Sequence, residues 1–187
     1  MKEKKIDRRV KYTLNSLINA MIELLQKEHI SKISVVALCK IADVNRSTFY
    51  THFEDQYHLL NYITQEALNN IQTYLQELDY HNNGELPVQT IKEILDYVQE
   101  NADIFKALLS DNCDPDIQRK VMRITEIVSP EDYKGLDKRT KDYFILYQIN
   151  GCISILHKWL QDDTPETTEE MSQLILKLLG KVPIARK

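Results

Sequence analysis

Residues 33–53 read ISVVALCKIADVNRSTFYTHF, and this stretch decides how the chain around it folds. Its first half predicts a short helix over Val35–Ile41. Ser34 opens this helix, because a serine hydroxyl at that position accepts a backbone N–H of the first turn. After a tight three-residue connection, Asn45 is expected to cap a second short helix over Arg46–His52. Two short helices joined in this way are typical of a helix-turn-helix.

The second of these helices has two faces of different chemistry. Phe49 and Phe53 are four residues apart, so they share one face and are expected to pack onto the helices before and after them. The opposite face carries hydrogen-bonding side chains, with Asn45 at its amino-terminal end: Arg46, Ser47, Tyr50 and Thr51. A helix of this kind reads DNA from its amino-terminal half, where arginine pairs with guanine and asparagine with adenine. The donors suited to backbone phosphates are Thr48, Tyr50 and His52.

The rest of the chain also predicts helices. Only four glycines and five prolines occur among 187 residues, so few residues interrupt helices. Helical spacing of apolar residues, caps and breakers predict about nine helices and no strand, which is an all-α fold. The expected ranges are about 8–28, 35–41, 46–52, 54–78, 88–100, 102–110, 114–128, 137–160 and 167–179, with YHNNGELP (80–87) as a linker. Asp137 is the expected cap of the long helix, and Thr167 forms a capping box with Glu170.

Charge divides the chain into two parts. Residues 1–62 hold 10 Lys and Arg against 7 Asp and Glu, a net charge of +3, whereas the remainder holds 14 against 21, a net charge of -7. A basic amino-terminal part on an acidic body suits binding to a polyanion. On charge alone, a solvated basic tail is an equal alternative. We expect a helix-turn-helix domain over residues 1–53 and a helical regulatory and dimerisation domain over residues 54–187.

The segment ISVVALCKIADVNRSTFYTHFEDQYHLL (33–60) resembles the DNA-binding domain of the tetracycline-repressor (TetR) family of bacterial transcriptional regulators. The resemblance covers about residues 8–63 and rests on Ser34, Ala42, Val44, Ser47, Thr48, Phe49, Tyr50, His52, Phe53, Leu59 and Leu60. It implies phosphate contacts by Ser34, Thr48, Tyr50 and His52. It implies base contacts by Asn45, Arg46, Ser47 and Thr51. Double-stranded DNA is therefore the expected partner.

Two positions depart from the family pattern. Asp43 stands in the turn where the family often has glycine, and aspartate tolerates a positive φ better than most residues. Gln56 stands where the family often has a lysine that touches phosphate. Glu54 and Asp55 next to it repel phosphate unless they point away. The basic residues near the amino terminus are the expected compensation.

The resemblance implies that the remaining chain is a helical domain for ligand sensing and dimerisation. The run YFILYQINGCISILHKWL (143–160) is apolar nearly all round, which predicts a helix buried on several sides, with Gly151 permitting close approach. With the last helix it is expected to form a four-helix bundle with the same pair of a second subunit. The interface residues of this homodimer are expected to be Ile149, Ile153, Leu156, Leu160, Leu174, Ile175 and Leu178. Ordinary internal core is the alternative for these residues.

Five aromatic residues are candidates for lining a ligand pocket between the helices: Tyr62, Tyr97, Phe105, Tyr147 and Trp159. Aromatic residues at helical spacing are more often core, so internal packing is the alternative for each. Nothing in the sequence marks a charged or metal-dependent effector. No cofactor and no metal are predicted.

These features predict a bacterial, cytoplasmic, homodimeric repressor that binds a palindromic operator and is released by a small molecule. A co-regulator that binds another protein is a second possibility, and the acidic start of the fourth helix fits it slightly better. An enzyme is disfavoured, because no Ser/His/Asp constellation, glycine-rich phosphate loop or metal-ligand spacing occurs. No apolar run reaches transmembrane length. Cys39, Cys113 and Cys152 lie far apart and are expected to be reduced core thiols.

Overall fold

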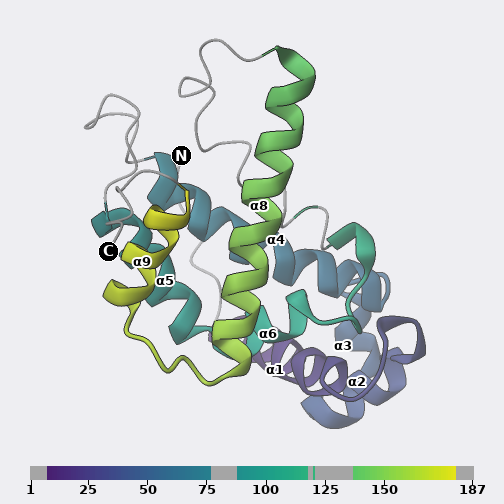
Figure 1. The fold of residues 1–187 in the computed structure, drawn as a ribbon. Coiled ribbons are helices and arrows are strands. Elements are labelled where there is room, and N and C mark those ends of the chain that lie inside the picture. Colours follow the sequence, from purple (N-terminus) through teal and green to yellow (C-terminus); the bar gives the residue numbers. More distant parts are fainter. Residues whose placement is uncertain (1–7, 77–87, 118–119, 121–136, 180–187) are drawn as a thin grey trace. The chain divides into compact units, whose positions relative to one another are not determined.

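Figure 1 shows the computed structural model of the chain, which describes residues 8–76, 88–117, 120 and 137–179. All regular elements of the described residues are helices, so the predicted all-α fold is confirmed. The chain forms two compact units. The first unit comprises Met1–Glu66 and Ala107–Ile117, and the second comprises Ala67–Lys106 and Gln118–Lys187. The domain boundary predicted after residue 53 stays a prediction, because compact packing does not by itself assign a function to either unit.

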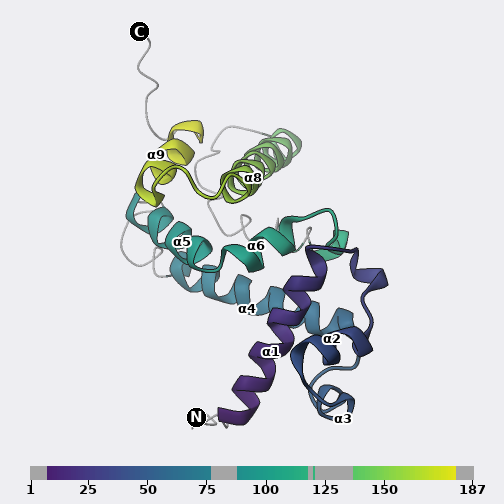
Figure 2. The ribbon, with the colours of Figure 1, turned by 90° about the horizontal axis from the view of Figure 1, so that it is seen from below.

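The first unit begins with three α-helices and one short 3-10 helix: α1 (Arg8–Leu25), η1 (Ile30–Lys32), α2 (Val35–Ala42) and α3 (Arg46–Tyr50). Helix α2 packs against α1, and α3 packs against α2 (Figure 2). The side chains that α1 buries recur at helical spacing, so one stripe of the helix faces the core: Leu17, Ala20, Met21, Ile22, Leu24 and Leu25. This arrangement is the predicted helix-turn-helix with a buttressing helix before it.

Two side chains begin the short helices as predicted. The Ser34 hydroxyl oxygen accepts the backbone N–H of Ala37 at 3.1 Å, and the Asn45 side-chain oxygen accepts the backbone N–H of Ser47 at 3.1 Å. Each bond satisfies one of the first four N–H groups of a helix, which have no partner inside the helix. The starts of α2 and α3 are therefore determined by local sequence.

Asp43 makes the turn between α2 and α3 without glycine. Its φ of 52° and ψ of 46° are left-handed, and its N–H donates to the carbonyl oxygen of Cys39. The N–H of Val44 donates to the same oxygen at 3.0 Å. Aspartate is one of the few side chains that adopt this conformation at small cost. The departure from the family's glycine therefore leaves the turn intact.

Two helices run through both units: α4 (Gln56–Gln76) and α6 (Ala102–Leu109). The acidic start of α4 serves as a cap, because a side-chain oxygen of Asp55 accepts the backbone N–H of His58 at 2.7 Å. A carboxylate at this end also interacts favourably with the helix dipole. The start of α4 is therefore stabilised by Asp55.

An aromatic cluster holds α3 in the first unit. Phe49 is fully buried and Phe53 is buried, and their ring centroids lie 5.8 Å apart. Phe53 also contacts α4, since its ring centroid is 5.5 Å from that of Tyr62 and 5.6 Å from that of His58. Helix α3 ends at Tyr50, earlier than predicted, because the chain tightens into a turn that brings Phe53 into this cluster. The predicted burial of both phenylalanines is confirmed, and so is the predicted contact with the following helix for Phe53.

The second unit contains α5 (Val88–Glu100), α8 (Lys138–Gln161) and α9 (Thr168–Leu178). Helices α5 and α9 lie side by side (Figure 1). Their buried apolar side chains are Ile91, Leu95, Val98, Met171, Ile175 and Leu176. Asp137 caps α8 as predicted, and its side chain accepts the N–H groups of Arg139 and Thr140. The predicted capping box of Thr167 and Glu170 is also present at the start of α9.

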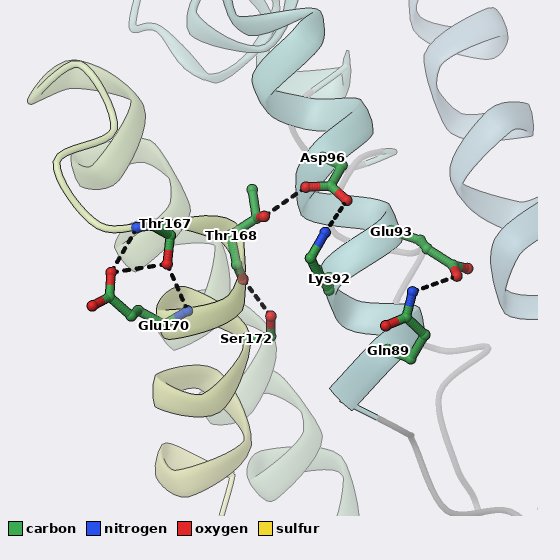
Figure 3. A network of polar contacts seen from close by, with 8 residues as sticks. All are labelled: Gln89, Lys92, Glu93, Asp96, Thr167, Thr168, Glu170 and Ser172. Atoms are coloured by element: carbon green, nitrogen blue, oxygen red, sulfur yellow. Dashed lines mark hydrogen bonds and ion pairs between the residues drawn. The ribbon is translucent and has the colours of Figure 1, made fainter.

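A polar network joins α5 to α9 (Figure 3). The Thr168 hydroxyl donates to one carboxylate oxygen of Asp96 at 2.5 Å, and the Lys92 ammonium group donates to the other at 2.6 Å. These two bonds hold the pKa of Asp96 below its ordinary value, because they favour the ionised carboxylate. The hydroxyl of buried Ser172 donates to the Thr168 carbonyl oxygen. The start of α9 is thus held on α5 by polar as well as apolar contacts.

Two predicted segments lie wholly or mostly outside the described residues, namely the linker over 80–87 and the helix over 114–128. The start of that helix is described: residues 115–117 are helical, and a side-chain oxygen of Asp114 accepts the N–H of Asp116 at 2.7 Å. The three cysteines are free, with Cys39 and Cys113 buried and Cys152 half-buried. None of the described helices combines the length and apolar character needed to cross a membrane.

Candidate nucleic-acid interface

The exposed face of α3 carries the side chains predicted to read bases. Arg46, Ser47 and Thr51 are exposed, and Tyr50 keeps 52% of its surface exposed. The Tyr50 ring stands edge-on to the buried ring of Phe49, with centroids 5.5 Å apart. This contact holds the base of the Tyr50 side chain while its hydroxyl group stays available. The structure therefore brings these four residues together on one solvent-facing surface.

Asn45 uses its side-chain oxygen inside the protein. That oxygen accepts both the backbone N–H and the hydroxyl of Ser47, each at 3.1 Å. A bidentate contact to adenine needs the carboxamide oxygen and nitrogen together. Two donors already occupy the two lone pairs of the oxygen, so the nitrogen is the group of Asn45 that remains for DNA. The bidentate pairing expected from residue type therefore conflicts with the capping role.

The hydroxyl of Thr51 also forms a hydrogen bond within the protein. Its hydroxyl donates to the carbonyl oxygen of Thr48 at 2.6 Å, three residues back. The lone pairs and the methyl group of Thr51 remain on the exposed face. A threonine methyl suits apolar contact with the methyl group of thymine. Thr51 is therefore able to offer DNA a methyl group and acceptor lone pairs, but not a hydroxyl donor.

The residues predicted to bind phosphates lie at two places in the first unit. Ser34 is exposed at the start of α2, where its oxygen accepts the N–H of Ala37. The proton of the same hydroxyl is still able to donate to a phosphate, since a hydroxyl both donates and accepts. Thr48 and His52 are half-buried at the edge of α3. Tyr50 lies on the base-facing surface, and its hydroxyl is also among the groups predicted to bind phosphate.

Charged side chains of both signs are exposed in the first unit. Glu54 and Asp55 are exposed before α4, and the Asp55 carboxylate caps the helix. Half-buried Gln56 stands where the family often has a phosphate-binding lysine, so this position carries no positive charge. At the start of α1, Arg8 and Lys11 are exposed. Basic side chains on α1 are therefore available to offset the carboxylates near α4.

Comparison with known proteins decides the family. Residues 85–181, just over half of the chain, match the model TetR_C_8, described as a transcriptional regulator C-terminal region. The chain belongs to the TetR family of transcriptional regulators. DNA-binding transcriptional regulation is the function of this family, and the helix-turn-helix of the first unit fits it. No curated protein sequence matches the chain.

Solved structures with the same fold support this membership. A TetR transcriptional regulator from Streptococcus agalactiae 2603V has 24% identity and a TM-score of 0.65, over 92% of this chain and 96% of that one. The dihydroxyacetone kinase operon activator DhaS has 19% identity and a TM-score of 0.55, over 90% and 94%. NalD, the secondary repressor of the MexAB-OprM multidrug efflux pump in Pseudomonas aeruginosa, has 16% identity and a TM-score of 0.60, over 91% and 96%. At these identities the likeness concerns the fold alone.

The aromatic residues predicted to line a TetR-type ligand pocket are divided between the units. Tyr62 lies in the first unit against Phe53. In the second unit, half-buried Tyr97 meets the buried ring of Phe105 edge-on, with centroids 5.8 Å apart. Trp159 is buried, and its indole N–H donates to a backbone carbonyl oxygen between α8 and α9 at 3.1 Å. Tyr97 and Phe105 are the two candidates that the structure brings into contact.

The first half of α8 exposes large apolar side chains in the single chain. The segment over 143–160 was expected to be buried on several sides, but four of its large apolar side chains are exposed: Tyr143 (59%), Phe144 (38%), Leu146 (55%) and Tyr147 (75%). Tyr147 therefore faces solvent on α8 of the single chain, and its assignment to a ligand pocket stays a prediction. A Cβ atom at Gly151 would meet no other atom within 4 Å, so no neighbour in the described chain requires glycine there. An apolar sequence predicts burial, but it does not say whether the cover comes from the same chain.

The predicted dimer-interface residues fall into three groups. Leu174 and Leu178 on α9 are exposed at 39% and 55%. Ile153 and Leu156 on α8 are half-buried. Leu160 and Ile175 are buried within the single chain, and their assignment to the dimer interface stays a prediction. The side chain of Ile149 lies outside those that the structure describes.

One segment of the first unit was not anticipated from the sequence. Residues 107–117 lie in the middle of the chain but pack in the first unit. Asn112 in this segment bonds to the end of α1. No motif marks such a contact, because the two partners are 87 residues apart.

Proposed function

We propose that this protein is a homodimeric repressor that binds a palindromic operator through α3 and is released from it by a small molecule. The observation that carries the proposal is the division of α3 into two faces. Phe49 is fully buried, whereas Arg46 and Tyr50 on the other side are exposed. A five-residue helix with one anchored face presents its other side chains in a fixed arrangement, as base recognition requires.

Each polar residue has a proposed role in this complex. Arg46 and Ser47 contact base edges from the amino-terminal end of α3, Thr51 contacts a thymine methyl, and Asn45 donates from its side-chain nitrogen. Ser34, Thr48, Tyr50 and His52 donate to phosphates on either side of the major groove. Phosphate contacts position the protein and base contacts supply the specificity, so loss of the two kinds of residue has different consequences.

Binding to DNA from upstream of the protein's own gene tests the proposal. Fluorescence anisotropy is expected to give a specific complex with two protomers per site. With about 6–10 phosphate contacts, the affinity should fall by roughly 10³–10⁵ between 50 and 200 mM salt. A promoter–reporter fusion then distinguishes repression from activation. Deletion of a repressor raises expression from the promoter that carries the operator, whereas deletion of an activator lowers it.

A co-regulator that binds another protein is the second candidate. The exposed carboxylates of Glu54 and Asp55, beside Gln56 in the place of a phosphate-binding lysine, favour it. Binding to neither the upstream DNA nor a genomic library, together with a retained partner protein, would support this candidate against the repressor.

The proposed homodimer uses the exposed apolar side chains of α8 and α9. A symmetric dimer presents two reading helices to two half-sites one helical turn apart. A ligand packed near Tyr97 and Phe105 would act by favouring a dimer in which this spacing no longer matches the operator. The affinity of the ligand for the two forms must differ, because equal affinity shifts nothing.

Leu178→Glu is expected to weaken the dimer about 30-fold. Leu178 is 55% exposed in the single chain. Burial of the rest of one leucine side chain contributes about 1 kcal/mol, and a symmetric interface contains two copies. The self-association constant is measured by sedimentation velocity over a range of concentrations.

Gln173→Glu is the matched control, because it adds the same carboxylate at another exposed position of α9. It should leave the dimer at wild-type strength. Equal self-association of Leu178→Glu and the wild type would exclude this face of α9 from the interface.

A further inference from the structure

Asn45 and Ser47 are joined by two hydrogen bonds beside the exposed face of α3. The backbone nitrogen and the hydroxyl oxygen of Ser47 each lie 3.1 Å from the side-chain oxygen of Asn45. A backbone N–H only donates, so the carboxamide atom that it meets must be the oxygen and not the NH₂ group. The main chain therefore determines the orientation of the Asn45 carboxamide.

This orientation also determines the direction of the second bond. A carboxamide oxygen has no proton to give, so the Ser47 hydroxyl must be the donor in its bond to Asn45. A serine hydroxyl carries one proton and two lone pairs, and here the proton is used inside the protein. Because Ser47 is exposed, its side chain presents an acceptor to DNA.

A hydroxyl that only accepts distinguishes between two classes of base. In the major groove, adenine and cytosine present an exocyclic amino group, which donates, whereas guanine and thymine present a carbonyl oxygen, which accepts. A serine that is free to rotate pairs with either class. Ser47 keeps its bond to Asn45 when it accepts from an amino group, but it must break that bond to donate to a carbonyl oxygen. The two classes of base therefore differ by one hydrogen bond.

We propose that Asn45 is a positioning residue that makes Ser47 a selective acceptor, so that the operator carries adenine or cytosine at the base that Ser47 contacts. The inference rests on the proposed DNA-binding function and adds to it the chemical class of one base in each half-site. Asn45 acts on this base through Ser47, in addition to the contact proposed for its own side-chain nitrogen.

Thr51 provides a reference on the same face of α3. Its hydroxyl also donates within the protein, at 2.6 Å, but the acceptor is the main-chain carbonyl oxygen of Thr48. No substitution of Asn45 removes that acceptor. The base preference at the Thr51 position should therefore stay constant in Asn45 variants, whereas the preference at the Ser47 position should depend on residue 45.

The first step of the test locates the base that Ser47 contacts. The full-length protein selects sequences from a library of random duplex DNA, and the selection is repeated with Ser47→Ala and Thr51→Ala. The base pair at which Ser47→Ala loses its preference is the Ser47 position, and Thr51→Ala locates the reference position in the same way. The wild-type protein is expected to select an amino base at the Ser47 position, and the selected sequence tells adenine from cytosine.

The second step compares the selected DNA with DNA in which this base is changed in both half-sites, adenine to guanine or cytosine to uracil. Either change replaces the amino group by a carbonyl oxygen and keeps the ring type. By fluorescence anisotropy, the wild-type affinity should fall about 25-fold, since one hydrogen bond contributes about fivefold in each half-site. Asn45→Gly should reduce this ratio to less than about threefold, because glycine keeps most of the stability of an N-cap and the released hydroxyl pairs with either class of base.

Asn45→Asp is the conservative control. A carboxylate oxygen also caps a helix, and it also accepts a hydroxyl proton. This variant should bind both DNAs more weakly, because its negative charge lies near phosphates, but it should keep the ratio of about 25-fold between them. Ser47→Ala retains the backbone N–H that Asn45 caps, and its ratio should be below about threefold because the acceptor is absent.

Selection of guanine or thymine at the Ser47 position by the wild-type protein would overturn the inference, and this result does not depend on whether Asn45→Gly folds. A folded Asn45→Gly protein that keeps the wild-type ratio would overturn it as well, because Ser47 would then be selective without Asn45. A change at the Thr51 position equal to that at the Ser47 position would indicate a general disturbance of α3 and would also contradict it. Failure of the wild-type protein to enrich any sequence would instead contradict the proposed function itself.

Discussion

Replacement of Arg46 by alanine is expected to abolish preference for the operator while leaving most of the binding to unrelated DNA. Arg46 is exposed at the first position of α3, where a guanidinium group is able to form a bidentate contact with guanine. Loss of one such contact costs about 1–3 kcal/mol, and a dimer loses it in both half-sites. Operator affinity should therefore fall by roughly 30-fold to 20,000-fold, measured by fluorescence anisotropy at fixed salt.

Ser34→Gly provides the contrasting variant. Glycine keeps most of the stability of an N-cap, so the substitution removes the hydroxyl with little effect on α2. A phosphate contact carries no sequence information. Ser34→Gly should therefore weaken binding to operator and unrelated DNA by the same factor. If Arg46→Ala also weakened both DNAs equally, Arg46 would be a phosphate contact and its assignment to base recognition would fail.

Replacement of Phe49 by alanine should destabilise the first unit by about 3–5 kcal/mol, the usual cost of removing a buried phenylalanine side chain. Phe49 has no exposed surface, and it contacts both Tyr50 and Phe53. A loss of this size is a large part of the total stability of a domain, which is about 5–15 kcal/mol. Urea denaturation measures the free energy of unfolding, and amide hydrogen exchange in α2 and α3 locates the loss.

Tyr50→Ala is the control for this substitution, because it removes the neighbouring aromatic ring from the exposed face. Its effect on the free energy of unfolding should be below about 1 kcal/mol, although it should weaken DNA binding. Phe49→Leu should lie between the two, since leucine fills much of the same volume. Equal stability of Phe49→Ala and Tyr50→Ala would contradict the assignment of one face of α3 to the core.

Much of the first unit was predictable because its signals are local. A side-chain cap acts within three residues, as Ser34 does on Ala37, so the starts of α2 and α3 follow from residue type and spacing. The i, i+4 spacing of Phe49 and Phe53 predicted their shared burial for the same reason. The capping box at Thr167 is a third case, since both of its bonds lie within one helical turn. Asn45 shows the limit of residue type, because its capping bonds occupy the oxygen that base recognition would use.

Contacts between distant segments needed the tertiary structure. Apolar character alone did not separate Leu160, which is fully buried, from Tyr147, which is 75% exposed. Both residues lie on α8, and burial depends on which other segment covers each part of the helix. Asn112 bonds to Leu25 across 87 residues, and no local pattern encodes that pairing. Helix starts and buried faces are properties of a few neighbouring residues, whereas the placement of residues 107–117 in the first unit results from packing of the whole chain.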